Sequence, residues 1–271
     1  MRPEQVGTGE TLLVETRTAE ASAARLDFRG ASYTLLAHDG GFWGVFAVPL
    51  NAALGPETLT VTLLDTAGAP LASLDAGYEV VDLGRAIDYL TLTPEQASVL
   101  TAEASAREAA LRGEQFAEFD HEVRWAGSFA PPVAGPLTSA FGVGRSFNGG
   151  PVGGFHGGAD FGGAEGTPVL AAGPGRVSWT GAMPIRGNTV LLDHGAGVKT
   201  GYHHFSRIDV GVGDVVEAGT QLGAIGATGL VTGPHLHWEL TIWGVNVDPV
   251  TWLSEAFAPS PPEPPAGLAA P

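Results

Sequence analysis

Short runs of apolar and β-branched residues, separated by turn residues, fill the first 82 positions of the chain. Apolar and polar positions partly alternate within these runs, which is typical of half-buried β-strands. Turn signals such as Asp39-Gly40-Gly41 and Gly55-Pro56 lie between them. The runs predict strands at Thr11–Thr18, Ala24–Phe28, Ser32–Leu36, Phe42–Val48, Thr58–Leu64 and Tyr78–Asp82. Several short strands at this spacing predict a small β-sandwich, which we assign to residues 1–90.

A different pattern follows, in which Ala, Glu, Gln and Arg dominate from Pro94 to Asp120. Thr93 is a candidate N-cap, because Pro94 occupies the first helical position and Gln96 lies at the capping-box place. The pattern predicts one helix, interrupted at Gly113. We expect this helix to act as a spacer or packing strut, without a chemical role.

Glycine and β-forming residues return from Trp125 to about Phe257. They predict a second β domain over residues 126–257, joined to the first by a helical linker of residues 91–125. The last segment, residues 258–271, is rich in Pro and Ala and is predicted to be disordered or extended. The chain is therefore predicted to be mainly β.

Composition narrows the classes of function. The 271 residues include 13 basic and 29 acidic side chains, for a formal net charge of −16. Nucleic-acid binding through phosphates needs clustered Lys and Arg, so we expect no nucleic-acid partner. The chain has no Cys, which excludes disulfides, thiolate nucleophiles and Cys-ligated zinc.

No stretch approaches the ~18 consecutive apolar residues of a membrane-spanning helix, so no transmembrane segment is predicted. The first residues lack the apolar core of a signal peptide. The protein is therefore either cytosolic or exported with a leader that is absent from this chain.

The eight His give the strongest chemical signal. His156 and Asp160 stand four residues apart in a Gly-rich segment, and both side-chain types are ordinary zinc ligands. His235 and His237 lie in a strand-like run after Pro234. In strand geometry both share one face with Glu239, and Leu236, Trp238 and Leu240 share the other.

A third cluster contains His203 and His204, which point to opposite faces of a strand, so that at most one enters a common site. The three segments together hold five of the eight His. One His, one Asp and a second His would give three protein ligands and an open fourth position. This ligand count suits a catalytic zinc.

The motif order resembles that of the lysostaphin-type (LytM-like) zinc metallopeptidases of peptidoglycan hydrolases. The order is His-x-x-x-Asp, then Tyr-x-His, then Gly-Pro-His-Leu-His. The similarity covers roughly residues 130–253, and further matching segments include Arg145-Ser-Phe-Asn-Gly149, Gly187-Asn-Thr-Val190, Asp193-His-Gly195 and Val247-Asp-Pro249. Phe155 and Phe205 depart from the usual residues without removing a ligand. The first domain, with its opening Val6-Gly7-Thr8-Gly9-Glu10, resembles a bacterial Ig-like domain.

The resemblance implies a mainly antiparallel β catalytic domain with a groove over zinc. It implies His156, Asp160 and His237 as zinc ligands and His204 and His235 as non-ligand catalytic histidines. We favour His235 as the base and His204 as the stabiliser of the oxyanion, although the sequence does not order the two. The implied reaction is hydrolysis of peptide bonds in peptidoglycan stem peptides or cross-bridges, by an exported protein of the periplasm or cell envelope. We favour a monomer.

Two other functions stay open at this point. One is a non-catalytic peptidoglycan-binding activator or scaffold of another hydrolase, and the other is a zinc peptidase for Gly-rich proteins. Latency is a further alternative to a plain linker, since Asn148, His121 or Glu122 could fill the open zinc position. We expect His194 to be a turn residue.

Overall fold

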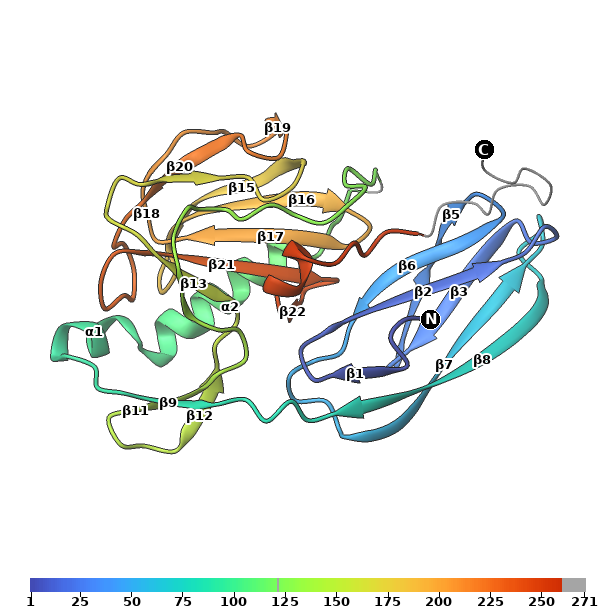
Figure 1. Cartoon of the computed structure of the whole chain (residues 1–271), viewed down its shortest axis with the longest axis horizontal. Coiled ribbons are helices and arrows are strands. Elements are labelled where there is room, and N and C mark those ends of the chain that lie inside the picture. The colour runs from blue at the N-terminus through green and yellow to red at the C-terminus, as the bar shows by residue number, and fades with distance from the viewer. Residues whose placement is uncertain (121, 260–271) are drawn as a thin grey trace, which may run out of the picture.

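In the computed structural model, which describes residues 1–120 and 122–259, the strands of the first 81 residues form two facing sheets (Figure 1). The larger sheet holds, in spatial order, β1 (Gln5–Gly7), β8 (Pro70–Val81), β7 (Gly55–Leu64), β3 (Ala23–Phe28) and β4 (Ala31–Thr34). The smaller sheet holds β2 (Thr11–Arg17), β6 (Gly41–Ala47) and β5 (Leu36–His38). Between the sheets, the rings of Phe28 and Phe46 lie 5.7 Å apart. The predicted β-sandwich is confirmed, while its Ig-like class stays a prediction.

The last strand of this N-terminal lobe is longer than predicted. The sequence predicts it over Tyr78–Asp82, whereas β8 begins at Pro70. Residues 70–75 are all exposed and show no alternation. Backbone pairing with β7 holds them in the strand. The sequence does not predict this part of the strand, because its side chains do not alternate between buried and exposed.

The linker contains β9 (Ile87–Leu90), α1 (Pro94–Val99) and α2 (Ala102–Gln115). The predicted capping box of Thr93 and Gln96 is present at the start of α1. The predicted interruption at Gly113 is wrong, because Gly113 lies inside α2. The helix breaks at Leu100 instead, since the side chain of Thr101 accepts from the Ala104 amide and caps a second helix.

The C-terminal lobe, residues 125–257, is built on an eight-stranded antiparallel sheet. Seven strands follow the order β10 (Leu137–Ser139), β13 (Ala159–Gly162), β21 (His235–Ile242), β17 (Val198–His203), β16 (Gly187–Gly195), β15 (Gly175–Met183) and β19 (Val215–Val216). The eighth strand, β22 (Val245–Val247), pairs with β21. Smaller elements are β11 (Gly144–Phe147), β12 (Val152–Phe155), β14 (Pro168–Leu170), β18 (Phe205–Ile208), β20 (Gln221–Ile225) and the 3₁₀ helix η1 (Val250–Leu253). The mainly β prediction is confirmed.

The two lobes share a core. The rings of Trp43 and Trp125 lie 6.0 Å apart, and those of Trp125 and Trp252 lie 5.8 Å apart. The indole N–H of Trp252 donates to Thr11 Oγ1 at 3.0 Å. These contacts join the N-terminal lobe to the C-terminal lobe. The linker between the lobes runs along the C-terminal lobe (Figure 1). Among the described residues, no helix is long and apolar enough to cross a membrane.

His194 is not the turn residue that the sequence predicts. It lies in β16 and is fully buried. Its Nδ1–H donates to the Pro174 carbonyl at 2.6 Å, and its Nε2 lies 2.7 Å from the Thr200 hydroxyl. These partners hold a neutral imidazole, and burial lowers the pKa of His194 to about 4.

We predict that His194 makes the protein less stable in mild acid. The unfolded chain binds a proton on this ring near pH 6.5, whereas the folded protein does so only near pH 4. The stability that His194 contributes is therefore complete above pH 6.5 and is lost as the pH falls towards 4, by about 3 kcal/mol at about 1.4 kcal/mol per pKa unit. Urea unfolding of wild type and His194→Gln at several pH values measures this difference. Equal slopes of unfolding free energy against pH in the two proteins would contradict it.

Candidate metal centre and active-site groove

Two neighbouring strands and the turn before one of them bring three side chains together. Asp160 of β13 and His237 of β21 are direct cross-strand partners. Between His156 and Asp160 the chain passes close to β21, where a Cβ at Gly158 would lie 2.4 Å from the Trp238 carbonyl oxygen. Only glycine permits this approach, which accounts for Gly158, the second of the two glycines that follow His156.

The facing atoms of the three side chains lie within hydrogen-bond distance of one another. Asp160 Oδ1 is 2.9 Å from His156 Nε2 and 2.7 Å from His237 Nδ1. The two imidazole nitrogens are 3.0 Å apart. His156 and His237 are buried, and all three residues meet the geometry of a group able to hold a metal ion.

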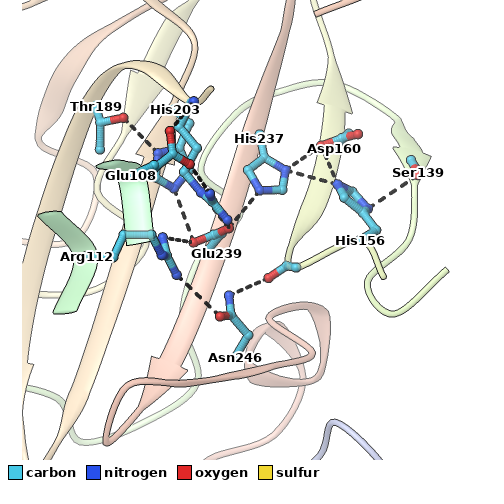
Figure 2. A network of polar contacts seen from close by, with 12 residues as sticks. Glu108, Arg112, Ser139, His156, Asp160, Thr189, His203, His237, Glu239 and Asn246 are labelled. Atoms are coloured by element: carbon cyan, nitrogen blue, oxygen red, sulfur yellow. Dashed lines mark hydrogen bonds and ion pairs between the residues drawn. The ribbon is translucent and has the colours of Figure 1, made fainter. Parts of the chain in front are cut away.

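The outward nitrogens of both rings are bonded to acceptors. His156 Nδ1–H donates to the Ala140 carbonyl at 2.8 Å. His237 Nε2–H donates to Glu239 Oε1 at 3.0 Å (Figure 2). In the neutral tautomers that these bonds require, His156 Nε2 and His237 Nδ1 carry lone pairs. Two lone pairs and a carboxylate oxygen thus face one another, an arrangement that needs a cation or a proton at its centre.

The charges around Asp160 favour that cation. Burial would raise the pKa of Asp160, but the hydrogen bonds and positive charge that His156 and His237 offer in their protonated forms outweigh it and lower the pKa. For His237, burial would lower the pKa, and the carboxylates of Asp160 and Glu239 raise it. Asp160 therefore stays ionised, and a metal ion at His237 Nδ1 would take the place of the proton that this nitrogen binds in the imidazolium form.

The cluster lies in a groove of about 260 Å³. One wall comes from the linker, through Leu90, Leu92, Gln96 and Leu100. Residues 230–232 also line the groove. The Gln96 side chain donates to the Val231 carbonyl at 2.9 Å. The linker is therefore more than a spacer, because it forms part of the site.

His204 and His235 lie beside the cluster on the same groove, with their rings 4.9 Å apart. His204 follows β17 with a φ of 64°, which takes it out of strand geometry. Its Nδ1–H donates to the Thr228 carbonyl, and that of His235 donates to the Gly233 carbonyl, both at 2.8 Å. Each ring therefore keeps an Nε2 lone pair for a ligand in the groove. Burial, reinforced by the charges of His237 and His235, lowers the pKa of His204 well below its ordinary value.

His203 does not line the groove. It is buried behind the cluster, with Nε2 3.5 Å from Glu239 Oε2 and Nδ1 2.9 Å from Thr189 Oγ1. His203, His237 and Glu239 form a second group with metal-site geometry. Arg112 and Arg186 already bind both oxygens of Glu239, so guanidinium groups supply the positive charge there.

Comparison with known proteins matches residues 154–249 to the family described as Peptidase family M23. This chain carries a peptidase family M23 domain. The peptidoglycan DD-endopeptidase ShyA of Vibrio cholerae is 46% identical over 93 residues, which are 34% of this chain and 22% of that protein. The DD-carboxypeptidase/endopeptidase Mpg of Neisseria meningitidis serogroup B is 41% identical over 96 residues, which are 35% of this chain and 22% of that protein. The chain spans about a fifth of the length of these curated relatives.

The similarity to one solved structure extends beyond the M23 domain. A crystal structure of a candidate peptidase M23 from Pseudomonas aeruginosa superposes with a TM-score of 0.66 at 29% identity. The alignment covers 91% of this chain and 94% of that one. The two-lobed arrangement with its linker is therefore shared with another protein.

Two of the three residues considered for latency have partners outside the cluster of His156, Asp160 and His237. Asn148 Oδ1 accepts from the Leu92 amide at 2.9 Å. The Glu122 carboxylate pairs with Arg124 at 2.8 Å. His121 lies outside the described residues, as do residues 260–271 of the predicted disordered tail.

Sequence reasoning missed several charged residues around the M23 cluster. Arg145, which lies in a quoted motif, donates to Ser139 Oγ at 3.0 Å and lies 3.7 Å from Asp160 Oδ2. Arg186, Glu108 and Arg112 surround Glu239 or its partners. The last two come from an Ala-rich helix, where Glu and Arg four residues apart are typical of a solvated surface, so no sequence signal marks them.

Proposed function

We propose that this protein is a zinc endopeptidase that hydrolyses peptide bonds in bacterial peptidoglycan, in stem peptides or cross-bridges. The main support is that His156, Asp160 and His237 converge on one open groove. Two further histidines, His204 and His235, line the same groove. The M23 domain and the names of its relatives support the substrate class. Peptidoglycan lies outside the cytoplasm, so the proposal includes export to the periplasm or cell envelope.

Zinc fits the donor set of His156, Asp160 and His237. Two imidazole nitrogens and one carboxylate oxygen are ligands that zinc prefers, and three protein ligands leave a position open towards the groove. When bound there, zinc would supply a Lewis acid that polarises a carbonyl and lowers the pKa of water. The remaining chemistry belongs to the side chains of the chain itself.

His204 and His235 are suited to proton transfer, because each presents Nε2 to the groove while a backbone carbonyl fixes the ring through Nδ1. A neutral imidazole in this tautomer accepts a proton at Nε2 and passes it on. We propose His235 as the base that takes a proton from water. The lowered pKa of His204 keeps that ring neutral, so His204 must gain a proton during the reaction before it can donate to an oxyanion.

The first prediction concerns the metal. Purified protein is expected to bind about one zinc per chain, measured by inductively coupled plasma mass spectrometry. Removal with a chelator abolishes the release of new amino groups from purified peptidoglycan, and added zinc restores it. His237→Ala loses both the zinc and the activity. Protein that binds no zinc and releases no amines would contradict the proposal, whereas zinc binding and wall binding without amine release would favour the non-catalytic activator.

The second prediction separates the two histidines from the ligands. His204→Ala and His235→Ala each lower kcat by about 10²–10⁴-fold, because each removes a proton-transfer group, while the zinc content stays near that of wild type. His38→Ala, in the N-terminal lobe, is the control and keeps full activity.

Loss of zinc in either His204→Ala or His235→Ala would assign that residue to the metal and contradict its proposed role. A cross-linked stem peptide with D-amino acids and a Gly-Gly peptide serve as parallel substrates. Turnover of the Gly-Gly peptide alone would move the substrate class to cross-bridges or Gly-rich proteins.

A further inference from the structure

A buried network of charges lies behind the metal ligand His237, and part of it comes from outside the M23 domain (Figure 2). Glu239 and Arg186 belong to residues 154–249, whereas Glu108 and Arg112 belong to α2. The side chains of Glu108 and Glu239 are 3% and 1% exposed. Charged groups at this depth need partners, because an uncompensated buried charge is strongly destabilising.

Both oxygens of Glu239 are held. Oε1 accepts from His237 Nε2 at 3.0 Å and from Arg186 Nε at 2.9 Å. Oε2 accepts from Arg112 Nη1 at 2.7 Å. The carboxylate that orients the imidazole of His237 is therefore fixed from one side by the C-terminal lobe and from the other by the linker helix.

Glu108 completes the frame. Its Oε2 accepts from the Ile185 amide at 2.6 Å and from the Arg186 amide at 3.0 Å, and its Oε1 pairs with the Arg186 guanidinium. Arg186 is thereby clamped between two carboxylates, Glu108 and Glu239. Because Glu108 and Arg112 are four residues apart on α2, they face the same side of the helix.

The same helix also reaches towards the second imidazole ligand. Arg112 Nη2 donates to Asn246 Oδ1 at 3.3 Å, and Asn246 Nδ2 donates to the Gly157 carbonyl at 2.6 Å. Gly157 directly follows His156. Arg112 is thus linked to the segment that carries His156 as well as to the partner of His237.

The way in which α2 packs differs from that of an ordinary strut. A helix that only supports a domain buries an apolar stripe, whereas the buried residue of α2 is Glu108. The helix therefore docks through charged side chains that converge on the partners of the metal ligands. Partners of this kind set the orientation of a ligand, and their loss typically lowers metal affinity by about 10–100-fold.

We propose that α2 is a positioning element of the metal centre, in which Arg112, backed by Glu108, holds Glu239 against His237 so that Nδ1 faces the metal. The inference rests on the proposed zinc site. It extends the functional unit beyond the family-matched residues, because residues 154–249 alone lack both side chains of α2. Arg112 and Glu108 are positioning residues and do not touch the substrate.

The test uses the full chain and compares Arg112→Ala with Arg107→Ala, an exposed arginine on the same helix. Zinc dissociation constants are measured by competition with a chromophoric chelator, and the thermal unfolding of the zinc-free proteins is measured in parallel. We expect the dissociation constant of Arg112→Ala to rise about 10–100-fold, and that of Arg107→Ala to match wild type. Cobalt-substituted Arg112→Ala should show an altered visible absorption spectrum, because the ligand geometry changes.

Arg112→Lys keeps the charge and one contact, and it serves if Arg112→Ala does not fold. Its zinc affinity should lie between those of wild type and Arg112→Ala. If Arg112→Ala does not fold, the zinc affinity of Arg112→Lys should still be lower than that of wild type. An Arg112→Ala or Arg112→Lys protein with lowered thermal stability but wild-type zinc affinity and cobalt spectrum would overturn the inference and leave α2 as a strut. Failure of wild type itself to bind zinc would instead overturn the proposed function.

Discussion

The site depends on one constraint, the convergence of three electron-pair donors at the junction of β13 and β21. His156 Nε2, Asp160 Oδ1 and His237 Nδ1 lie 2.7–3.0 Å apart, and the outward bonds of the two rings leave their inner nitrogens without protons. The two lone pairs and the carboxylate oxygen repel one another unless a cation lies between them. The direct pairing of Asp160 with His237 and the glycine turn after His156 are the backbone features that bring the atoms together.

The inner nitrogens keep their lone pairs only while the other nitrogen of each ring donates its proton to a hydrogen-bond partner. For His237 the partner is Glu239, a carboxylate buried among two guanidinium groups. Burial raises the pKa of Glu239, and the charges of Arg112 and Arg186 outweigh it and keep the pKa well below its ordinary value. The helix α2 lies against the C-terminal lobe, where Arg112 reaches Glu239 and Glu108 reaches the Ile185 amide.

Much of this arrangement follows from local sequence pattern. The alternation around His235 and His237 predicts their common face, and the structure places Leu236, Trp238 and Leu240 in the core behind it. The Thr93 capping box predicts the start of α1. Local pattern fails where tertiary contacts decide. β8 is extended by pairing alone, and the inward direction of Glu108 and Arg112 depends on partners more than 75 residues away. The break before α2 is different, because the cap that Thr101 provides is a local signal that the prediction of one helix overlooked.

Anomalous diffraction at the zinc edge from crystals of the full chain is the most direct test of the account. The account predicts one strong peak within about 2.0–2.2 Å of its ligands, bonded to Nε2 of His156, a carboxylate oxygen of Asp160 and Nδ1 of His237. The Nε2 atom of His237 should remain hydrogen-bonded to Glu239. A peak bonded to His237 Nε2, a peak among His203, His237 and Glu239, or no peak in protein grown with zinc would contradict it.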